Sequence, residues 1–306
     1  MNEPPHGILL VDKPGGLTSH DVVARVRRAA ATRQVGHAGT LDPMATGLLV
    51  VLVGEATKLS AWLTLDEKRY VTTVRFGATT DTLDADGAVT ETREGPAPSA
   101  EAVTAAVAAL VGPMQQTPPA VSAIKVGGVA MHERVRRGES VELAPRPVTL
   151  HRATLLAVRE GECDVDLTAS KGFYVRSYAR DLAAALGTVA HLTALRRLAS
   201  GAFTVGEALD ADTLARAAKG DVTARAALRE KVLPIAAAGR AMPVVTVDDD
   251  AAKALGQGKR PPCAHPDGTV LVLDARGEPV CVATAGDGVL KVERGFVRTA
   301  GPAPDA

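Results

Sequence analysis

The stretch Gly-His-Ala-Gly-Thr-Leu-Asp-Pro-Met-Ala-Thr-Gly at residues 36–47 leads directly into the apolar run Leu-Leu-Val-Val-Leu-Val at residues 48–53. This run has the length and the branched side chains of a strand that is buried on both faces. Pro43 directs Asp42 toward an extended conformation, and the glycines at positions 36 and 39 permit tight turns. The carboxylate of Asp42 is therefore held on a loop beside a central strand, which is a common placement for a reactive group.

Asp42 also fits a purely structural role. An aspartate before a proline often forms a local turn or caps the next helical turn. The physics of residues 36–47 alone favours that role over catalysis, so the rest of the chain must decide between the two.

Composition places the chain among folded proteins with one large and one small domain. It has 306 residues, and 46% of them are hydrophobic, which is enough for a sizeable core. No apolar run is long enough to span a bilayer and no secretory signal precedes the first strand, so we expect a cytoplasmic protein. The three cysteines lack the paired spacing of a zinc site, so we expect buried thiols and no metal.

The charges balance, because the chain has 35 basic and 35 acidic residues. A net charge of zero is not typical of a nucleic-acid-binding protein, although the basic residues could still gather on one face. Basic residues cluster within 25–33, 125–137, 171–180 and 196–197, and acidic residues gather within 81–101 and 248–250. Each cluster taken alone is most simply a solvated helix face.

Three predicted elements surround the Asp42 loop in the sequence. Residues 7–11 have the pattern of a strand, and Thr18 fits the N-cap of a following helix with Asp21 at its third position. Residues 68–76 alternate as a strand that puts Tyr70 on the same face as Thr72, Val74 and Phe76. A lone buried tyrosine is most simply a packed residue whose hydroxyl group finds a partner.

The middle of the chain carries two loops of interest. The aspartate-rich residues 81–87 lack the glutamate and the flanking helices of a calcium-binding EF-hand, so we expect no metal there. Residues 117–147 are bounded by prolines and carry several basic side chains. Long irregular segments of this kind in compact domains are usually binding loops or lids.

The last third of the chain is predicted to hold helices and then a separate strand-rich unit. A helix over 175–186 carries Arg176 near its start, which is either a surface arginine or a guanidinium that pairs with a carboxylate across a cleft. Leu192, Leu195 and Leu198 have helical spacing and predict a helix over 191–198. An Ala/Gly linker at 236–241 precedes the final segment.

The string at residues 36–47 resembles the nucleophile loop of the TruB-type tRNA pseudouridine synthases, Gly-His-x-Gly-x-Leu-Asp-Pro-x-Ala-x-Gly, at every fixed position. Residues 9–14, 68–70, 81–87, 170–176 and 195–198 also match that family. The resemblance implies an α+β catalytic domain at 1–235 with a mixed, largely antiparallel sheet, flanking helices and a thumb-like RNA-binding insertion at about 118–146. It further implies a small PUA-like RNA-binding β-barrel at 242–306.

The same resemblance assigns roles to seven residues. It implies that Asp42 is the nucleophile, that Tyr70 stacks on the target base and that Arg176 pairs with Asp42. His37, Tyr174 and Leu195 would line the substrate site, and Asp84 would contact the flipped nucleotide. The implied substrate is uridine 55 in the T arm of tRNA, and we expect a monomer that needs no cofactor and no protein partner.

The residue types fit that chemistry. Forming pseudouridine breaks the N1–C1′ bond and rejoins the uracil through C5, which requires an ionised carboxylate, a nearby cation and a base that has left the stack. The sequence does not distinguish attack on the base, attack on the sugar and abstraction of a sugar proton. Two other functions stay open, namely a non-catalytic RNA-binding or RNA-folding protein and a guide-RNA-dependent synthase of the dyskerin type.

Overall fold

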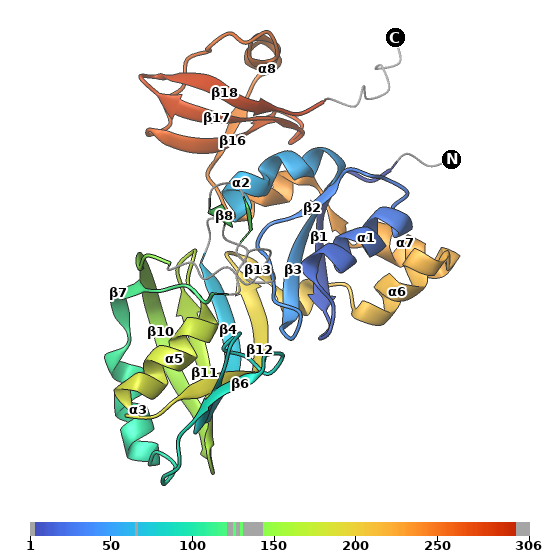
Figure 1. Cartoon of the computed structure of the whole chain (residues 1–306). Coiled ribbons are helices and arrows are strands. Elements are labelled where there is room, and N and C mark those ends of the chain that lie inside the picture. Colours follow the sequence, from blue (N-terminus) through green and yellow to red (C-terminus); the bar gives the residue numbers. More distant parts are fainter. Residues whose placement is uncertain (1–3, 65–66, 121–124, 127–128, 131–142, 298–306) are drawn as a thin grey trace.

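The computed structural model describes residues 4–64, 67–120, 125–126, 129–130 and 143–297. Ten strands of this part of the chain form one long sheet, and they are β1 (Gly7–Lys13), β2 (Val35–His37), β3 (Thr46–Val53), β4 (Lys68–Phe76), β7 (Gly112–Gln116), β10 (Arg146–Arg159), β11 (Glu162–Ala169), β12 (Ala190–Ser200), β13 (Phe203–Thr204) and β14 (Val232–Leu233). Their order is β14-β1-β3-β12-β4-β11-β10-β7, with β2 beside β3 and β13 beside β12 (Figure 1).

The sheet has two halves that meet at β3 and β12. All of its pairings are antiparallel except the short parallel contact of β12 with β3, where Arg196 and Arg197 lie opposite Thr46 and Gly47. The apolar run at 48–53 is fully buried within β3, as predicted. Because the Asp42 loop ends where β3 begins, that loop lies at the junction of the two halves.

Helices cover both halves, and they are α1 (Ser19–Ala29), α2 (Ser60–Leu63), α3 (Ala100–Ala109), α5 (Val175–Ala185), α6 (Ala211–Lys219) and α7 (Val222–Glu230). Helix α1 begins with the predicted capping box, in which the Thr18 hydroxyl accepts from the Asp21 N–H and the Asp21 carboxylate accepts from the Thr18 N–H. Helices α3 and α5 lie against β10, β4 and β12, whereas α1, α6 and α7 lie near β1 and β14 (Figure 1). The predicted mixed, largely antiparallel α+β fold is therefore confirmed.

The helix predicted over 191–198 is wrong, because these residues belong to strand β12. The register of β12 against β4 shifts between Leu192 and Ala194 and again between Arg197 and Ala199. Each such bulge adds one residue to the alternation of a strand. The first shift therefore buries Leu192 and Leu195 on one face although they are three positions apart, which imitates the spacing of a helix, whereas Leu198 lies at the second shift and is only half-buried.

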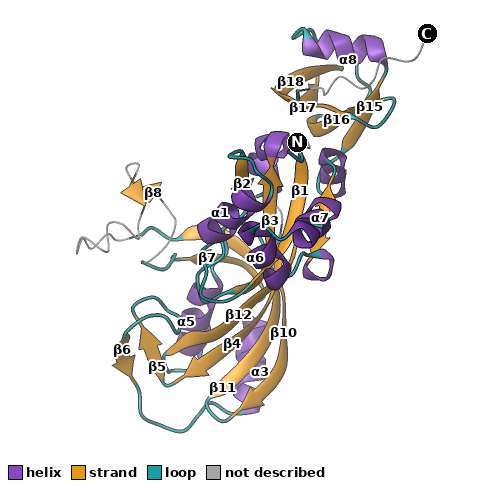
Figure 2. Cartoon of the chain, turned by 90° about the vertical axis from the view of Figure 1, so that its right-hand side faces the viewer, coloured by secondary structure: helices purple, strands orange, loops and turns teal. Residues whose placement is uncertain are grey.

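The final segment forms a second, smaller sheet with the order β15 (Val244–Val247), β16 (Gly268–Asp274), β17 (Pro279–Gly286) and β18 (Val289–Gly295), together with α8 (Asp249–Gly256). The described strands form an open sheet, so the expected closed barrel is not confirmed. Figure 2 shows this unit at one end of the molecule. Leu271 and Val282 of the small sheet share a core cluster with Leu59 and Ile235, so the unit packs against the rest of the chain.

Most of the predicted insertion at 118–146 lies outside the described residues, although its two ends are described. Strand β7 ends at Gln116 and strand β10 begins at Arg146, and these two residues lie opposite each other in register. Between them the structure describes the short strands β8 (Lys125–Val126) and β9 (Val129–Ala130). Among the helices of the described residues, none has the length and apolar character needed to cross a membrane.

Candidate active site

The Asp42 loop is shaped by two glycines in the left-handed region. Gly39 has φ +99° and Gly47 has φ +98°, where residues with a side chain are strained. A β-carbon at Gly47 would overlap the carbonyl oxygen of Arg197 on the neighbouring strand β12. Gly36, in contrast, has no positive φ, so the predicted role in a tight turn applies to Gly39 and not to Gly36.

Buried polar side chains beneath the loop hold its backbone, and the sequence motifs do not predict this role for them. The ammonium group of Lys13 donates to the carbonyl oxygens of Pro14, Leu17 and Pro43 at 3.0, 2.7 and 3.1 Å. Lys13 is fully buried, and burial lowers its pKa to about 8. The hydroxyl group of Ser19 accepts from the N–H of Leu41 at 2.8 Å and lies 3.1 Å from its carbonyl oxygen.

Arg197 supports the same loop from strand β12. Its guanidinium group donates to the carbonyl oxygens of Leu48, Thr40 and Gly39 at 2.7, 3.4 and 3.1 Å, and its exposed fraction is 1%. The signal that could have revealed it is a charged residue on the inward face of a leucine-rich strand. Its place in the basic cluster at 196–197 favours a solvated surface position, and that interpretation is wrong for Arg197.

A pocket of about 310 Å³ opens beside this loop. Asp42 lies in its lining together with Tyr70 from β4, Leu195 from β12, and Tyr174 and Arg176 at the start of α5, so five of the seven predicted site residues come together. The other lining residues are Gly39, Thr40, Leu41, Thr64, Lys68, Ser170, Gly172, Phe173, Val175 and Arg197.

The expected ion pair between Asp42 and Arg176 is present. Arg176 Nε lies 2.9 Å from one carboxylate oxygen of Asp42, and Nη2 donates to the other at 3.1 Å. A third nitrogen, Nη1, donates to the carbonyl oxygen of Thr82 at 2.8 Å. The arginine is only 4% exposed, so the guanidinium group is fixed by the protein and is nearly free of competing water.

A second carboxylate shares this guanidinium. One oxygen of Asp84 lies 3.6 Å from Arg176 Nε, and the other accepts from the hydroxyl group of Thr82 at 2.6 Å and from the N–H of Asp86 at 3.1 Å. Asp84 sits in the turn between β5 (Ala78–Thr80) and β6 (Val89–Thr92) and is buried. It is not part of the pocket lining in the described structure.

The surroundings of Asp42 set its ionisation. Burial raises the pKa of its carboxyl group above the ordinary value, the Arg176 guanidinium opposes that rise, and the charge of Asp84 adds to it. The side chain is still 32% exposed, which leaves one side of the carboxylate open to the pocket. Asp42 is thus a carboxylate whose charged form depends on its arginine and whose free side faces a cavity.

His37 lies outside the lining of this pocket, at the end of β2 and 6.1 Å from the ring of His20 on α1. Burial, His20 and Arg197 lower the pKa of its imidazole, so the ring is neutral near pH 7. Within the described residues its buried Nδ1 atom has no hydrogen-bond partner.

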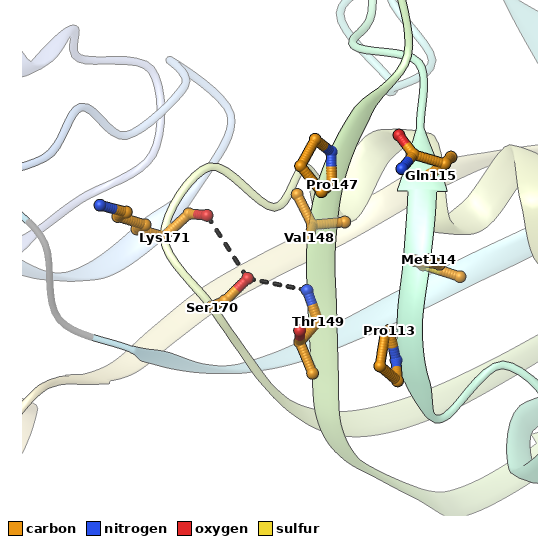
Figure 3. Close-up of a pocket in the computed structure, with 8 residues that line it drawn as sticks. All are labelled: Pro113, Met114, Gln115, Pro147, Val148, Thr149, Ser170 and Lys171. Atoms are coloured by element: carbon orange, nitrogen blue, oxygen red, sulfur yellow. Dashed lines mark hydrogen bonds between the residues drawn. The ribbon is translucent and has the colours of Figure 1, made fainter.

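A larger pocket of about 460 Å³ lies elsewhere, between β7, β10 and the loop that follows β11 (Figure 3). Its lining residues are Pro113, Met114, Gln115, Pro147, Val148, Thr149, Ser170 and Lys171. They include no carboxylate, no histidine and no tyrosine. The smaller pocket therefore has the groups for chemistry, and the larger one does not.

Two family models match the chain. The family model "TruB family pseudouridylate synthase (N terminal domain)" matches residues 27–175, and "tRNA pseudouridylate synthase B C-terminal domain" matches residues 176–238. The tRNA pseudouridine synthase B of Thermobifida fusca is 47% identical over 285 residues, which cover 87% of this chain and 93% of that protein. The protein of the same name from Nocardia farcinica is 55% identical over 218 residues, which cover 70% and 71%.

Among solved structures, a chain of a Cbf5-Nop10-Gar1 complex aligns with a TM-score of 0.73 at 22% identity, covering 95% of this chain and 85% of its own. At that identity the likeness concerns the fold alone. The sequence relatives and the family models carry the assignment. The chain therefore belongs to the TruB family of pseudouridylate synthases.

Proposed function

We propose that the protein isomerises uridine to pseudouridine in tRNA, at uridine 55 of the T loop, with Asp42 as the nucleophile. The observation that carries the proposal is the Asp42–Arg176 ion pair, which lies in a pocket that Tyr70 also lines. An isomerisation of this kind changes no redox state, and it needs a charged carboxylate held against a base that has left its stack.

Arg176 has two tasks in this mechanism. It opposes the rise in pKa that burial causes for the Asp42 carboxyl group, and two of its nitrogens fix the orientation of the carboxylate. Attack on uracil, attack on C1′ and abstraction of a sugar proton all require the ionised form of Asp42. The ion pair therefore serves whichever of the three routes the reaction follows.

The remaining residues hold the nucleotide. Tyr70 offers a ring that can stack on the target base and a hydroxyl group for proton transfer, while Leu195 and Tyr174 also line the pocket. We expect His37, neutral and beside the loop, to occupy the space that the flipped base leaves. Contact of Asp84 with the nucleotide stays a prediction, because its carboxylate is turned to Arg176, Thr82 and Asp86 here.

The decisive experiment is to incubate a tRNA transcript with the protein alone and map pseudouridine. Asp42→Asn keeps the shape but removes the charge, so product formation should stop while RNA binding survives. Asp86→Asn, an exposed carboxylate on another loop, is the matched control and should react like wild type. If Asp42→Asn turns over near the wild-type rate, the assignment fails. If wild type binds RNA without converting it, the protein is a binding or guide-dependent factor.

We also propose that the T arm is a sufficient substrate and that the protein acts as a cytoplasmic monomer. Side chains read unpaired RNA loops because A-form helices hide their base edges. An isolated T-arm stem-loop should therefore be converted, with affinity falling as salt rises. If only folded full-length tRNA reacts, recognition depends on the whole tRNA and this account is wrong.

The two-unit organisation, 1–235 for catalysis and 242–306 for RNA binding, is part of the same proposal. Deleting residues 242–306 should weaken binding of whole tRNA more than it slows conversion of a bound stem-loop. Because Leu271 and Val282 pack on the large unit, the deletion exposes apolar surface, and circular dichroism must confirm that the remainder is folded.

A further inference from the structure

Gln116 is a buried amide at the root of the proline-bounded insertion. It is the last residue of β7 and is only 1% exposed. Its Oε1 accepts from the N–H of Tyr174 at 2.7 Å, and its Nε2 donates to the carbonyl oxygen of Tyr174 at 3.2 Å. One side chain thus satisfies both main-chain groups of a residue 58 positions away, as a neighbouring strand would do.

Tyr174 occupies a position where such support matters. It precedes the first turn of α5 and makes no capping bond with its own side chain. Two residues later Arg176 forms the ion pair with Asp42. The hydroxyl group of Ser177 donates to the carbonyl oxygen of Thr117 at 2.8 Å, so the residue after Gln116 holds the same turn.

Arg146 holds the side chain of Tyr174 from the other root of the insertion. It lies opposite Gln116 in register, and its guanidinium carbon is 4.8 Å from the centre of the Tyr174 ring. Tyr174 is therefore held at its backbone by Gln116 and at its ring by Arg146.

We propose that Gln116 is a positioning residue for the reaction, and this proposal rests on the function proposed above. It is outside the pocket lining and touches no reacting group. By fixing the backbone of Tyr174 it sets two things at once, the Tyr174 ring in the pocket wall and the approach of Arg176 to Asp42. A displacement of about 1 Å at such a site can cost about 100-fold in rate.

The test replaces Gln116 by methionine, which is similar in length and unbranched but cannot form either hydrogen bond. Under single-turnover conditions with excess enzyme and T-arm RNA, Gln116→Met should react about 100-fold more slowly than wild type. Its Kd for the RNA should stay within about threefold, because RNA affinity comes mainly from phosphate contacts, which this buried amide does not make. Gln115→Met is the matched control, since Gln115 is the exposed neighbour on the same strand and should leave both values unchanged.

Two further readouts separate positioning from a general loss of structure. If Arg176 moves relative to Asp42, the acid limb of the pH–rate profile should shift to higher pH in Gln116→Met, whereas a smaller folded fraction would scale the rate equally at every pH. Gln116→Glu keeps the acceptor for the shorter bond and should restore part of the rate. If the methionine variant does not fold, Gln116→Glu is sufficient for the test. Its Kd should be unchanged, and its rate should fall by less than the roughly 100-fold expected for Gln116→Met.

A Gln116→Met rate within threefold of wild type, or a loss confined to Kd, would overturn the proposal. An unshifted acid limb together with a Gln116→Glu rate no better than that of Gln116→Met would do the same. Wild-type protein that forms no pseudouridine would instead refute the proposed function, so the two failures are distinguishable.

Discussion

Asp84→Asn should move the acid limb of the pH–rate profile to lower pH. Asp42 must be ionised to react, and its pKa is raised by burial and by the negative charge of Asp84. Asparagine removes that charge and leaves Arg176 with one carboxylate to neutralise. The pKa of Asp42 therefore falls, and the variant should keep its activity at a pH where wild type has begun to lose it.

The size of the shift follows from the shared guanidinium. Arg176 Nε lies 2.9 Å from one oxygen of Asp42 and 3.6 Å from one oxygen of Asp84, so these two oxygens are at most about 6.5 Å apart. At that distance and an effective dielectric constant of about 20, two unit negative charges repel each other by about 2.6 kcal/mol. That repulsion alone would amount to nearly two pH units. Because Asp42 is partly exposed, solvent screens it, and we expect a shift of about one unit.

The assay is the single-turnover rate on T-arm RNA from about pH 4.5 to pH 8, with unfolding checked at each pH. Asp86→Asn removes the same charge from the same turn at an exposed position and should leave the limb in place. A limb that stays put in Asp84→Asn, or that moves to higher pH, would show that Asp84 does not act on the ionisation of Asp42.

Two other substitutions test separate parts of the site. Tyr70→Phe should be nearly as harmful as Tyr70→Ala, because we assign a proton transfer to the hydroxyl group; a phenylalanine variant within a few-fold of wild type would leave stacking as the whole role. Gly47→Ala should lower the free energy of unfolding in urea by about 3 kcal/mol, because φ is +98° and the new methyl group overlaps the Arg197 carbonyl. Gly36→Ala, with open space around it, is its control, and equal stability of the two variants would contradict the reasoning.

Much of the fold could be predicted from the sequence where the signals are local. The capping box at Thr18 and Asp21, the buried run of β3 and the alternation of β4 depend on neighbouring residues only, and all three are present. Strand β12 could not be predicted, since its bulges depend on pairing with β4, more than 100 residues earlier in the chain. Its tertiary context overrode the periodicity of Leu192, Leu195 and Leu198.

The bulge in β12 also has a consequence for the site. After the shift at Leu192 and Ala194, Leu195 lies opposite Thr72 and Arg197 opposite Tyr70. Without the extra residue, Leu195 and Arg197 would point to the other face of the sheet, away from the pocket and the Asp42 loop. The feature that misled the helix prediction is therefore the one that places two of the lining residues.

Three basic residues that would raise the RNA-binding charge of the chain turn out to be interior. Lys13 and Arg197 donate hydrogen bonds to backbone carbonyl groups, and Arg176 forms an ion pair with Asp42. All three residues are less than 5% exposed. A buried cation of this kind is retained for the groups it orients, since a surface cation would bind phosphate equally well without the cost of desolvation. Counterion release depends only on cations that reach the phosphates. Any salt dependence of RNA binding should therefore come from exposed cations of the basic clusters, such as Arg28 and Lys171, and not from these three buried residues.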